Sequence, residues 1–384
     1  MAERSYEIVV FGATGFTGGI VAYWLATQFP DLRWALAGRD LAKLETVRAG
    51  LSAEAPHCAQ LPLLEADTSD PNSLLEIARS TRVLLTTVGP YLQYGAAALD
   101  ACVEAGTDYV DLTGEPEFVA SSIRKHHETA SSKGLRIVSC CGFDSIPPDL
   151  GAWFNVQQLP RQAAIRCEGY VRTRGNVSGG TWNTALEAMS RPQKGISRGL
   201  IPHGHNVRAR MLGHRLHRAP LGGYAVPLPT IDPMVVLRSA QLLGYGPDFN
   251  YGHYAHVKTK RYLVGGVLGV GLIAGFAQIG PIRQQMKRWI PPGTGPNQRA
   301  MDHGWMTVTH IGTEGDRTVR TRISCDKDAG YLMTARMIAS CALCLARDRD
   351  TLSHQVGVIT PVAAMAEALV PRLKHAGFRF EVLD

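Results

Sequence analysis

Residues 6–18 read YEIVVFGATGFTG, an apolar segment as long as a buried strand, followed at once by three glycines with the spacing G-x-x-G-x-x-G. A helix-like pattern begins inside this loop and runs over 15–29. In such a setting the first glycine permits a tight turn, the second lets backbone N–H groups approach a pyrophosphate, and the third lets the helix pack on the sheet. A plain tight turn is the competing interpretation. We expect a dinucleotide to contact Gly12, Ala13, Thr14, Gly15, Phe16 and Thr17.

Strand-like and helix-like segments continue to alternate up to about residue 140. Further strands are predicted at 33–37, 61–66, 82–88, 108–112 and 135–139, and helices at 40–51, 71–79, 96–105 and 117–133. Alternation of this kind is typical of a parallel sheet built from βα units. We therefore predict an α/β fold in which residues 1–150 form a Rossmann-type domain.

The pattern changes after the segment CGFDSIPP at 141–148. Longer strands are predicted at 164–173, 305–312 and 318–325, helices at 330–345 and 361–374, and a closing strand at 378–383. Successive strands with few helices between them favour an antiparallel sheet. We predict that residues 151–384 form a second, α+β domain.

The end of the second predicted strand indicates which dinucleotide is preferred. NAD-binding proteins usually place Asp or Glu there to bind the ribose 2′-hydroxyl. This chain instead has Gly38 and Arg39, with Lys43 one helical turn further on. Because a guanidinium suits a 2′-phosphate, NADP(H) is favoured over NAD. Asp67, after the third strand, either accepts a hydrogen bond from the adenine or caps a helix.

The turn after the fourth strand is expected at the nicotinamide end of the cofactor. Its residues are Val88, Gly89, Pro90 and Tyr91. Hydride transfer needs positioning and one proton donor. Tyr91 is the first candidate donor, although it could instead stack on the nicotinamide or pack under the loop.

Three further candidates for catalysis follow the fifth and sixth strands. These are Asp111, Cys141 and Asp144. Asp111 and its neighbour Glu115 could orient substrate or cap the helix that begins near Glu117. A thiol at a strand end more often packs than reacts, and Asp144 fits the start of a helix equally well.

The charges are distributed unevenly. The chain of 384 residues is 45% hydrophobic and carries a net charge of +7, which describes a folded protein with ample core. Residues 188–301, however, contain fifteen Lys/Arg and two acids, Asp232 and Asp248. This basic region is either a solvated face or the site of an anionic partner: a phosphate-bearing substrate, an acidic carrier protein or a membrane. A nucleic-acid partner is not expected, because the region has no recognisable nucleic-acid-binding motif.

Residues 262–277 read YLVGGVLGVGLIAGFA, a segment without charge that extends in weaker form to 282. Basic residues flank it: Lys258, Lys260 and Arg261 before it, and Arg283, Lys287 and Arg288 after it. As a helix it would span about 24 Å, less than the ~30 Å hydrocarbon core of a bilayer. Two interpretations remain: a buried helix that walls an apolar substrate pocket, or an interfacial anchor on a membrane.

Cysteine usage bears on the compartment and on metals. Eight cysteines without paired spacing indicate a reducing compartment, and residues 1–5 leave no room for a targeting peptide before the first strand. We expect a cytoplasmic protein, peripheral at a membrane if 262–282 binds one. Cys341 and Cys344 have metal-like spacing, but they share one face of an apolar helix with no second pair nearby, so no metal is expected.

Five of these segments together resemble the saccharopine dehydrogenase-like family, and most closely its branch of trans-acting enoyl reductases of lipid polyketide biosynthesis. They are GATGFTG at 12–18, AGRD at 37–40, VGPY at 88–91, YVDLTGE at 109–115 and CGFDSIPPDLG at 141–151. The resemblance is close over the first 151 residues and looser beyond. It implies that the first domain binds NADP(H), and that the second supplies the substrate pocket and the contacts of a homodimer.

The resemblance also implies NADPH-dependent reduction, either of a carbon–carbon double bond in an acyl chain or of an imine. The apolar segment 262–282 suits a hydrophobic chain, carried on CoA or on an acidic carrier protein, better than a multiply charged amino acid. We therefore prefer the enoyl substrate over a saccharopine-type imine. A third hypothesis is a lipid-associated protein that binds NADP(H) without turnover.

Overall fold

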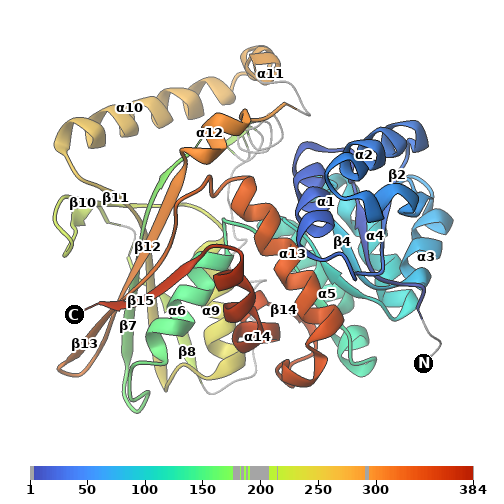
Figure 1. Ribbon diagram of the computed structural model, residues 1–384. Coiled ribbons are helices and arrows are strands. Elements are labelled where there is room, and N and C mark those ends of the chain that lie inside the picture. The colour runs from blue at the N-terminus through green and yellow to red at the C-terminus, as the bar shows by residue number, and fades with distance from the viewer. Residues whose placement is uncertain are drawn as a thin grey trace. The chain divides into compact units, whose positions relative to one another are not determined.

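The computed structural model describes residues 4–175, 207–213, 215–289 and 294–383, together with 182, 186, 189 and 190 (Figure 1). Contacts divide the chain into two compact units. The first comprises Met1–Leu150 with Tyr331–Phe378, and the second comprises Gly151–Gly330 with Arg379–Asp384. We predicted that residues 151–384 form the second domain, but Tyr331–Phe378 lies in the first unit.

The first unit is built on a seven-stranded parallel sheet in the order β14-β6-β5-β4-β1-β2-β3. Its strands are β1 (Tyr6–Phe11), β2 (Trp34–Gly38), β3 (Leu63–Glu65), β4 (Thr81–Thr86), β5 (Asp108–Val110), β6 (Arg136–Val138) and β14 (Gly357–Ile359). Without β14 this is the 3-2-1-4-5-6 order of a Rossmann fold, so the predicted parallel sheet is confirmed. The seventh strand was not expected.

Helices cover this sheet and form much of its core. They are α1 (Phe16–Gln28), α2 (Leu41–Glu54), α3 (Pro71–Ser80), α4 (Tyr91–Ala105), α5 (Pro116–Ser132), α13 (Leu332–Arg347) and α14 (Pro361–His375). Two short 3-10 turns complete the set, η1 (Pro56–Gln60) and η2 (Arg349–Thr351). Helix α13 packs on α1 and over β1, β4 and β5, while α4 lies between α3 and α5.

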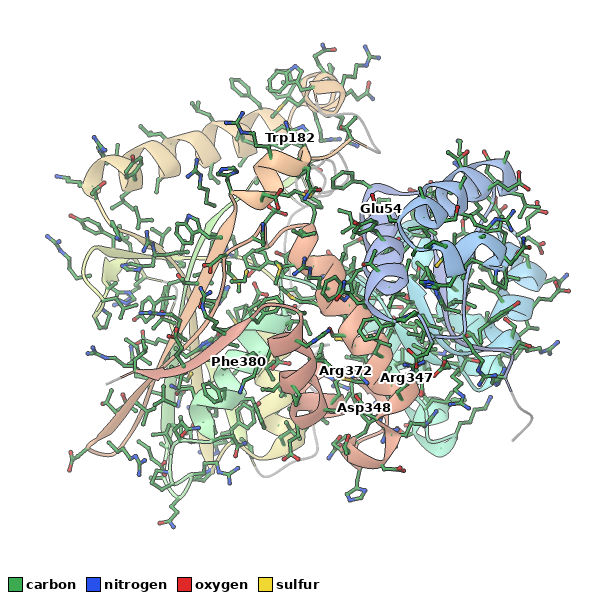
Figure 2. The ribbon with its side chains drawn as sticks, in the orientation of Figure 1. Glu54, Trp182, Arg347, Asp348, Arg372 and Phe380 are labelled. Atoms are coloured by element: carbon green, nitrogen blue, oxygen red, sulfur yellow. The ribbon has the colours of Figure 1, made fainter. Side chains whose placement is uncertain are left out.

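Helix α13 explains why Tyr331–Phe378 belongs to the first unit. Thirteen of its residues are buried, including both Cys341 and Cys344. At its end the Arg347 guanidinium donates to the Glu7 carboxylate of β1 at 2.8 Å. The next residue, Asp348, accepts two bonds from Arg372 of α14 at 2.5 and 2.7 Å (Figure 2).

The second unit contains an eight-stranded sheet in the order β15-β13-β12-β7-β11-β10-β9, with β8 also paired to β11. The strands are β7 (Ile165–Arg174), β8 (Arg208–Met211), β9 (His217–Arg218), β10 (Tyr224–Pro227), β11 (Asp248–Val257), β12 (Trp305–Glu314), β13 (Arg317–Cys325) and β15 (Arg379–Leu383). Strand β11 runs parallel to β7 and to β8, and the other pairs are antiparallel. The sheet is therefore mixed, where we expected it to be antiparallel.

Within the described ranges, the helices of this unit include α6 (Ile146–Val156), which begins in the first unit, α9 (Asp232–Leu243), α10 (Lys260–Ala277), α11 (Gly280–Trp289) and α12 (Gln298–Asp302). Ala152 and Val156 of α6 share a buried cluster with Val236 and Leu237 of α9 and with Phe249 of β11. Helix α10 contrasts with α6 and α9, because only 11% of it is buried. In the described structure it therefore does not form the buried wall of a pocket.

In the first unit, α1 and β1 approach so closely that two positions exclude a side chain. Gly12 has a φ of +92°, and a Cβ there would lie 2.7 Å from Val88 Cγ2. A Cβ on Gly18 would lie 2.2 Å from the Gly12 carbonyl oxygen. Side chains rarely adopt the φ of Gly12, and the Gly12 carbonyl is backbone that cannot yield to a Cβ on Gly18, so both glycines are needed for this packing.

Gly18→Ala should therefore destabilise the first unit by about 1–3 kcal/mol or more, and should weaken NADPH binding with it. Gly19→Ala is the matched control, because a Cβ there meets its nearest atom, the Ala13 carbonyl oxygen, at 3.8 Å. The control should keep its affinity and gain up to ~1 kcal/mol from helix propensity. Urea unfolding and NADPH titration test both variants, and equal behaviour of the two would contradict this packing.

Candidate active site

The N-terminus of α1 is open to an anion. Its N-cap residue, Gly15, makes no side-chain cap, and the first turn contains no acid. Thr14 and Gly15 are exposed, and the first N–H groups of an α-helix have no acceptor within the helix. Unpaired N–H groups and the positive end of the helix dipole together favour a pyrophosphate. The loop Gly12–Thr17 thus has the form that the sequence predicts for a dinucleotide site.

The neighbouring helix α4 contrasts with α1, because a carboxylate already occupies its N-terminus. Glu115 Oε1 accepts from the Tyr91 backbone N–H at 2.7 Å, and Oε2 accepts from that of Leu92 at 3.1 Å. Glu115 was expected to orient substrate or to cap the helix that follows it; the helix it caps is α4. A second anion is thereby disfavoured at α4.

Three residues follow the carboxyl end of β2. Asp40 caps α2 by accepting from the Lys43 backbone N–H at 3.1 Å, and the Lys43 ammonium lies 3.4 Å from the same carboxylate. The first position after the buried Gly38 is Arg39, which is exposed. Asp40 is thus engaged as a cap, Arg39 is exposed at this edge, and the contact of its guanidinium with a 2′-phosphate stays a prediction.

Asp67 lies near Arg39 at the end of β3. Its carboxylate accepts from the backbone N–H and the hydroxyl of Ser69 at 2.8 and 2.7 Å. These bonds, with a smaller contribution from the Arg39 charge, lower the pKa of Asp67. Asp67 does not cap α3, because Asp70 accepts from Asn72 there. Its contact with adenine stays a prediction.

The turn Val88–Pro90 lies beside the glycine loop. The Thr87 backbone N–H donates to the Phe11 carbonyl at 3.0 Å, and the Thr87 hydroxyl donates to the Gly12 carbonyl at 3.2 Å. The exits of β1 and β4 are thereby joined at the point where the strand order reverses, which is where Rossmann folds bind dinucleotides. Gly89 and Pro90 are exposed at this edge.

Tyr91 has a different environment from the one a proton donor needs. The hydroxyl donates to the Thr86 carbonyl at 3.2 Å and accepts from the Leu112 N–H at 3.1 Å. The ring is buried against Phe118. Burial, followed by the nearby charge of Asp111, raises the pKa of Tyr91 well above its usual range. This geometry favours the packing alternative for Tyr91.

Asp111 joins the ends of β5 and β6 from a fully buried position. Its Oδ1 accepts from the Thr113 and Cys140 N–H groups, both at 3.0 Å, and Oδ2 accepts from the Ser139 hydroxyl at 2.9 Å. Burial raises the pKa of Asp111 to about 6, against these stabilising bonds. The carboxylate therefore holds the backbone beside the cofactor edge.

The last two candidates differ in exposure. Cys141 is fully buried, and burial raises the pKa of its thiol well above the usual value, which makes it a poorer acid. Asp144, three residues further along, is exposed. Of the four predicted catalytic side chains, Asp144 alone is accessible from solvent.

The second unit contains a buried polar chain that no sequence motif indicated. His253 Nε2 lies 3.2 Å from Asp232 Oδ2, and the Tyr251 hydroxyl lies 3.3 Å from His253 Nδ1 and 3.4 Å from His310 Nε2. The chain crosses β7 at Gly169, where a Cβ would lie 2.6 Å from the Tyr251 oxygen. Each neighbouring pair lies within hydrogen-bonding distance. These residues could not be grouped from the sequence, because they come from α9, β11 and β12, which are far apart along the chain.

Comparisons with known proteins agree with this geometry. Residues 8–138 match the model of the saccharopine dehydrogenase NADP binding domain. A Mycobacterium tuberculosis protein is 37% identical over 97% of this chain and 96% of its own length. The trans-acting enoyl reductases of Mycobacterium bovis and Mycobacterium ulcerans are 36% identical, each over 98% of this chain and 97% of their own.

Among solved structures, the saccharopine dehydrogenase (L-Glu forming) of Saccharomyces cerevisiae aligns with a TM-score of 0.58 at 10% identity, covering 99% of this chain and 100% of that one. At this identity the likeness shows the fold alone. The fold, the open helix N-terminus and the matched domain define an NADP(H)-dependent oxidoreductase. The chain belongs to the saccharopine dehydrogenase-like family, together with the trans-acting enoyl reductases.

Arg39→Ala should weaken NADPH binding by about 1.5–3 kcal/mol and leave NADH binding nearly unchanged, because only NADPH carries the 2′-phosphate. Lys43→Ala should lose less NADPH affinity, since the Lys43 ammonium of the wild type already pairs with Asp40. Fluorescence titration with both cofactors measures the difference. Equal losses for NADPH and NADH in Arg39→Ala would overturn the assignment.

The pKa of Asp111 predicts a pH effect with a definite sign. The folded state raises this pKa from 3.8 to about 6, so it binds the proton more tightly than the unfolded state does. The protonated Asp111 carboxyl therefore contributes to the free energy of unfolding below about pH 4, and this contribution is lost as the pH rises through about 6. Asp111→Asn should gain stability over the wild type across this window, on the order of 1–3 kcal/mol. Unfolding free energies of both proteins at several pH values test this. The prediction is wrong if the advantage of Asp111→Asn over the wild type shrinks as the pH rises.

Proposed function

We propose that this protein is an NADPH-dependent enoyl reductase that saturates the carbon–carbon double bond of a hydrophobic acyl chain. The observation that carries the proposal is the 36% identity, over 98% of this chain, to relatives named trans-acting enoyl reductase. Near-complete coverage of both chains means that the second unit, which the saccharopine dehydrogenase domain model does not reach, is shared with these relatives as well.

The chemistry assigns different tasks to the residues of the first unit. When bound, NADPH supplies a hydride to the β-carbon of the enoyl group, the π bond breaks, and the α-carbon takes a proton from an acid or from water. The N-terminus of α1 would hold the pyrophosphate and Arg39 the 2′-phosphate. Since Tyr91, Asp111 and Cys141 are buried, we propose Asp144 as the residue that orients a proton-donating water at this edge.

The basic region supports an acyl group that carries phosphate, such as a CoA or carrier-protein thioester. Four arginines around β8 and β9 are exposed: Arg208, Arg210, Arg215 and Arg218. Phosphate and acidic protein surfaces are the anions that guanidinium groups bind best. Three further basic residues of this region, Arg191, Lys194 and Arg198, lie outside the described residues.

A screen of NADPH oxidation against 2-enoyl thioesters of increasing chain length, imines and amino acids tests the proposal. We expect long-chain enoyl thioesters to be reduced with one saturated product per NADPH consumed, as seen by mass spectrometry. Turnover of imines alone would favour the saccharopine-type alternative. Saturable NADPH binding without turnover of any of them would favour a non-catalytic NADP(H)-binding protein.

A further inference from the structure

Helix α10 exposes far more apolar surface than a folded protein usually leaves in water. Tyr262, Leu268 and Leu272 are each 61–62% exposed, and Val267 and Val270 are each 54–57% exposed. A Cβ added at Gly265, Gly266, Gly269, Gly271 or Gly275 would meet no atom within 4 Å. Only 11% of this helix is buried, and its buried residues are Leu263 and Ala277. An apolar surface of this extent marks a contact with a partner or a membrane.

The exposed apolar positions surround most of the helix. Val264, Leu268 and Leu272 recur every four residues along one face, and Val267 and Val270 lie on the adjacent face. Within the described residues, cover comes at Leu263 near the start of the helix and along a strip where Ile273 and Ala277 pack with Met286 of α11 and with Leu186. A groove on a protein partner would cover one stripe of a helix, whereas lipid can cover all of these faces together.

The charges and aromatic residues at the ends of this segment fit an anionic lipid surface. Between Asp248 and Asp302 the sequence has no acid and seven basic residues: Lys258, Lys260, Arg261, Arg283, Lys287, Arg288 and Arg299. Tyr262 begins the apolar stretch, and Trp289, 65% exposed, ends α11. Tyrosine and tryptophan favour the boundary between headgroups and acyl chains, and basic side chains reach the phosphates there.

The topology excludes a simple span. By length and composition, α10 is the one helix within the described ranges that could cross a membrane, with a mean hydropathy of 1.3 over 18 residues. Strands β11 and β12, which precede and follow the α10–α12 segment, both pair with β7 in one sheet. If α10 crossed a membrane, the chain would have to cross back to rejoin this sheet. The helix that would cross back, α11, carries Arg283, Lys287 and Arg288, which are costly in hydrocarbon.

We propose that α10 and α11 form an interfacial membrane anchor, in which α10 lies in the plane of an anionic bilayer with Val264, Leu268 and Leu272 among the acyl chains. This inference does not depend on the enoyl substrate. It implies that the protein reaches amphiphilic molecules at the lipid surface, where hydrophobic acyl chains concentrate.

Co-sedimentation with vesicles of phosphatidylcholine, with and without phosphatidylserine, tests the proposal. Wild type should bind the mixed vesicles more tightly than pure phosphatidylcholine, and high salt should weaken that preference. The double variant Leu268→Ser/Leu272→Ser should lose about tenfold or more in affinity for both kinds of vesicle. Gly271→Leu should bind more tightly than wild type, since it adds apolar surface where nothing stands in the way.

Val382→Ser is the matched control, because Val382 is 55% exposed on β15 of the same unit but lies outside the proposed anchor. It should bind vesicles as the wild type does. Circular dichroism and thermal unfolding report the folding of every variant. The proposal is overturned if wild type binds neither kind of vesicle, or if the double variant binds as tightly as wild type. It is also overturned if light scattering shows a dimer that the double variant breaks while vesicle binding stays absent, because a second copy would then cover α10.

Discussion

The first unit depends on the close approach of the Gly12 carbonyl to Gly18. No side chain fits between them, so α1 lies directly against the exit of β1 and its N-terminus is fixed at the crevice between β1 and β4. Thr87 reinforces this arrangement, because its hydroxyl donates to the same Gly12 carbonyl from the strand on the other side. One backbone contact thus sets both the packing of the helix and the position of its dipole.

Acids at the edge of this sheet occupy the N-termini of the helices next to α1 and leave that of α1 open. Asp40 caps α2, Asp70 caps α3, Glu115 caps α4, and α5 carries Glu117 in its first turn. Among α1–α5, only α1 begins with neither a side-chain cap nor an acid. The positive ends of four helices are thereby balanced by acids of the chain itself, and the fifth is left for the phosphates of the cofactor.

Local patterns explain what the sequence could predict. The βα units and the glycine loop follow from periodicity and spacing within short segments, and the helix over Tyr262–Ala277 follows from its composition. Strand β14 was missed because it has three residues and pairs with β6, far away in the chain. The sequence left Tyr91 open between proton donation and packing because its position after β4 says nothing about its side chain, which bonds to the Leu112 N–H and packs on Phe118 in the core. For the same reason, no spacing showed that Tyr251, His253 and His310 meet across Gly169, or that α10 is exposed.

The most direct test of this account is an experimental structure of the complex with NADP+. The account predicts that the pyrophosphate accepts hydrogen bonds from the backbone N–H groups at the start of α1, that the 2′-phosphate contacts Arg39, and that the nicotinamide lies beside Val88–Pro90. A dinucleotide bound away from α1, or one whose 2′-phosphate points away from Arg39, would contradict it.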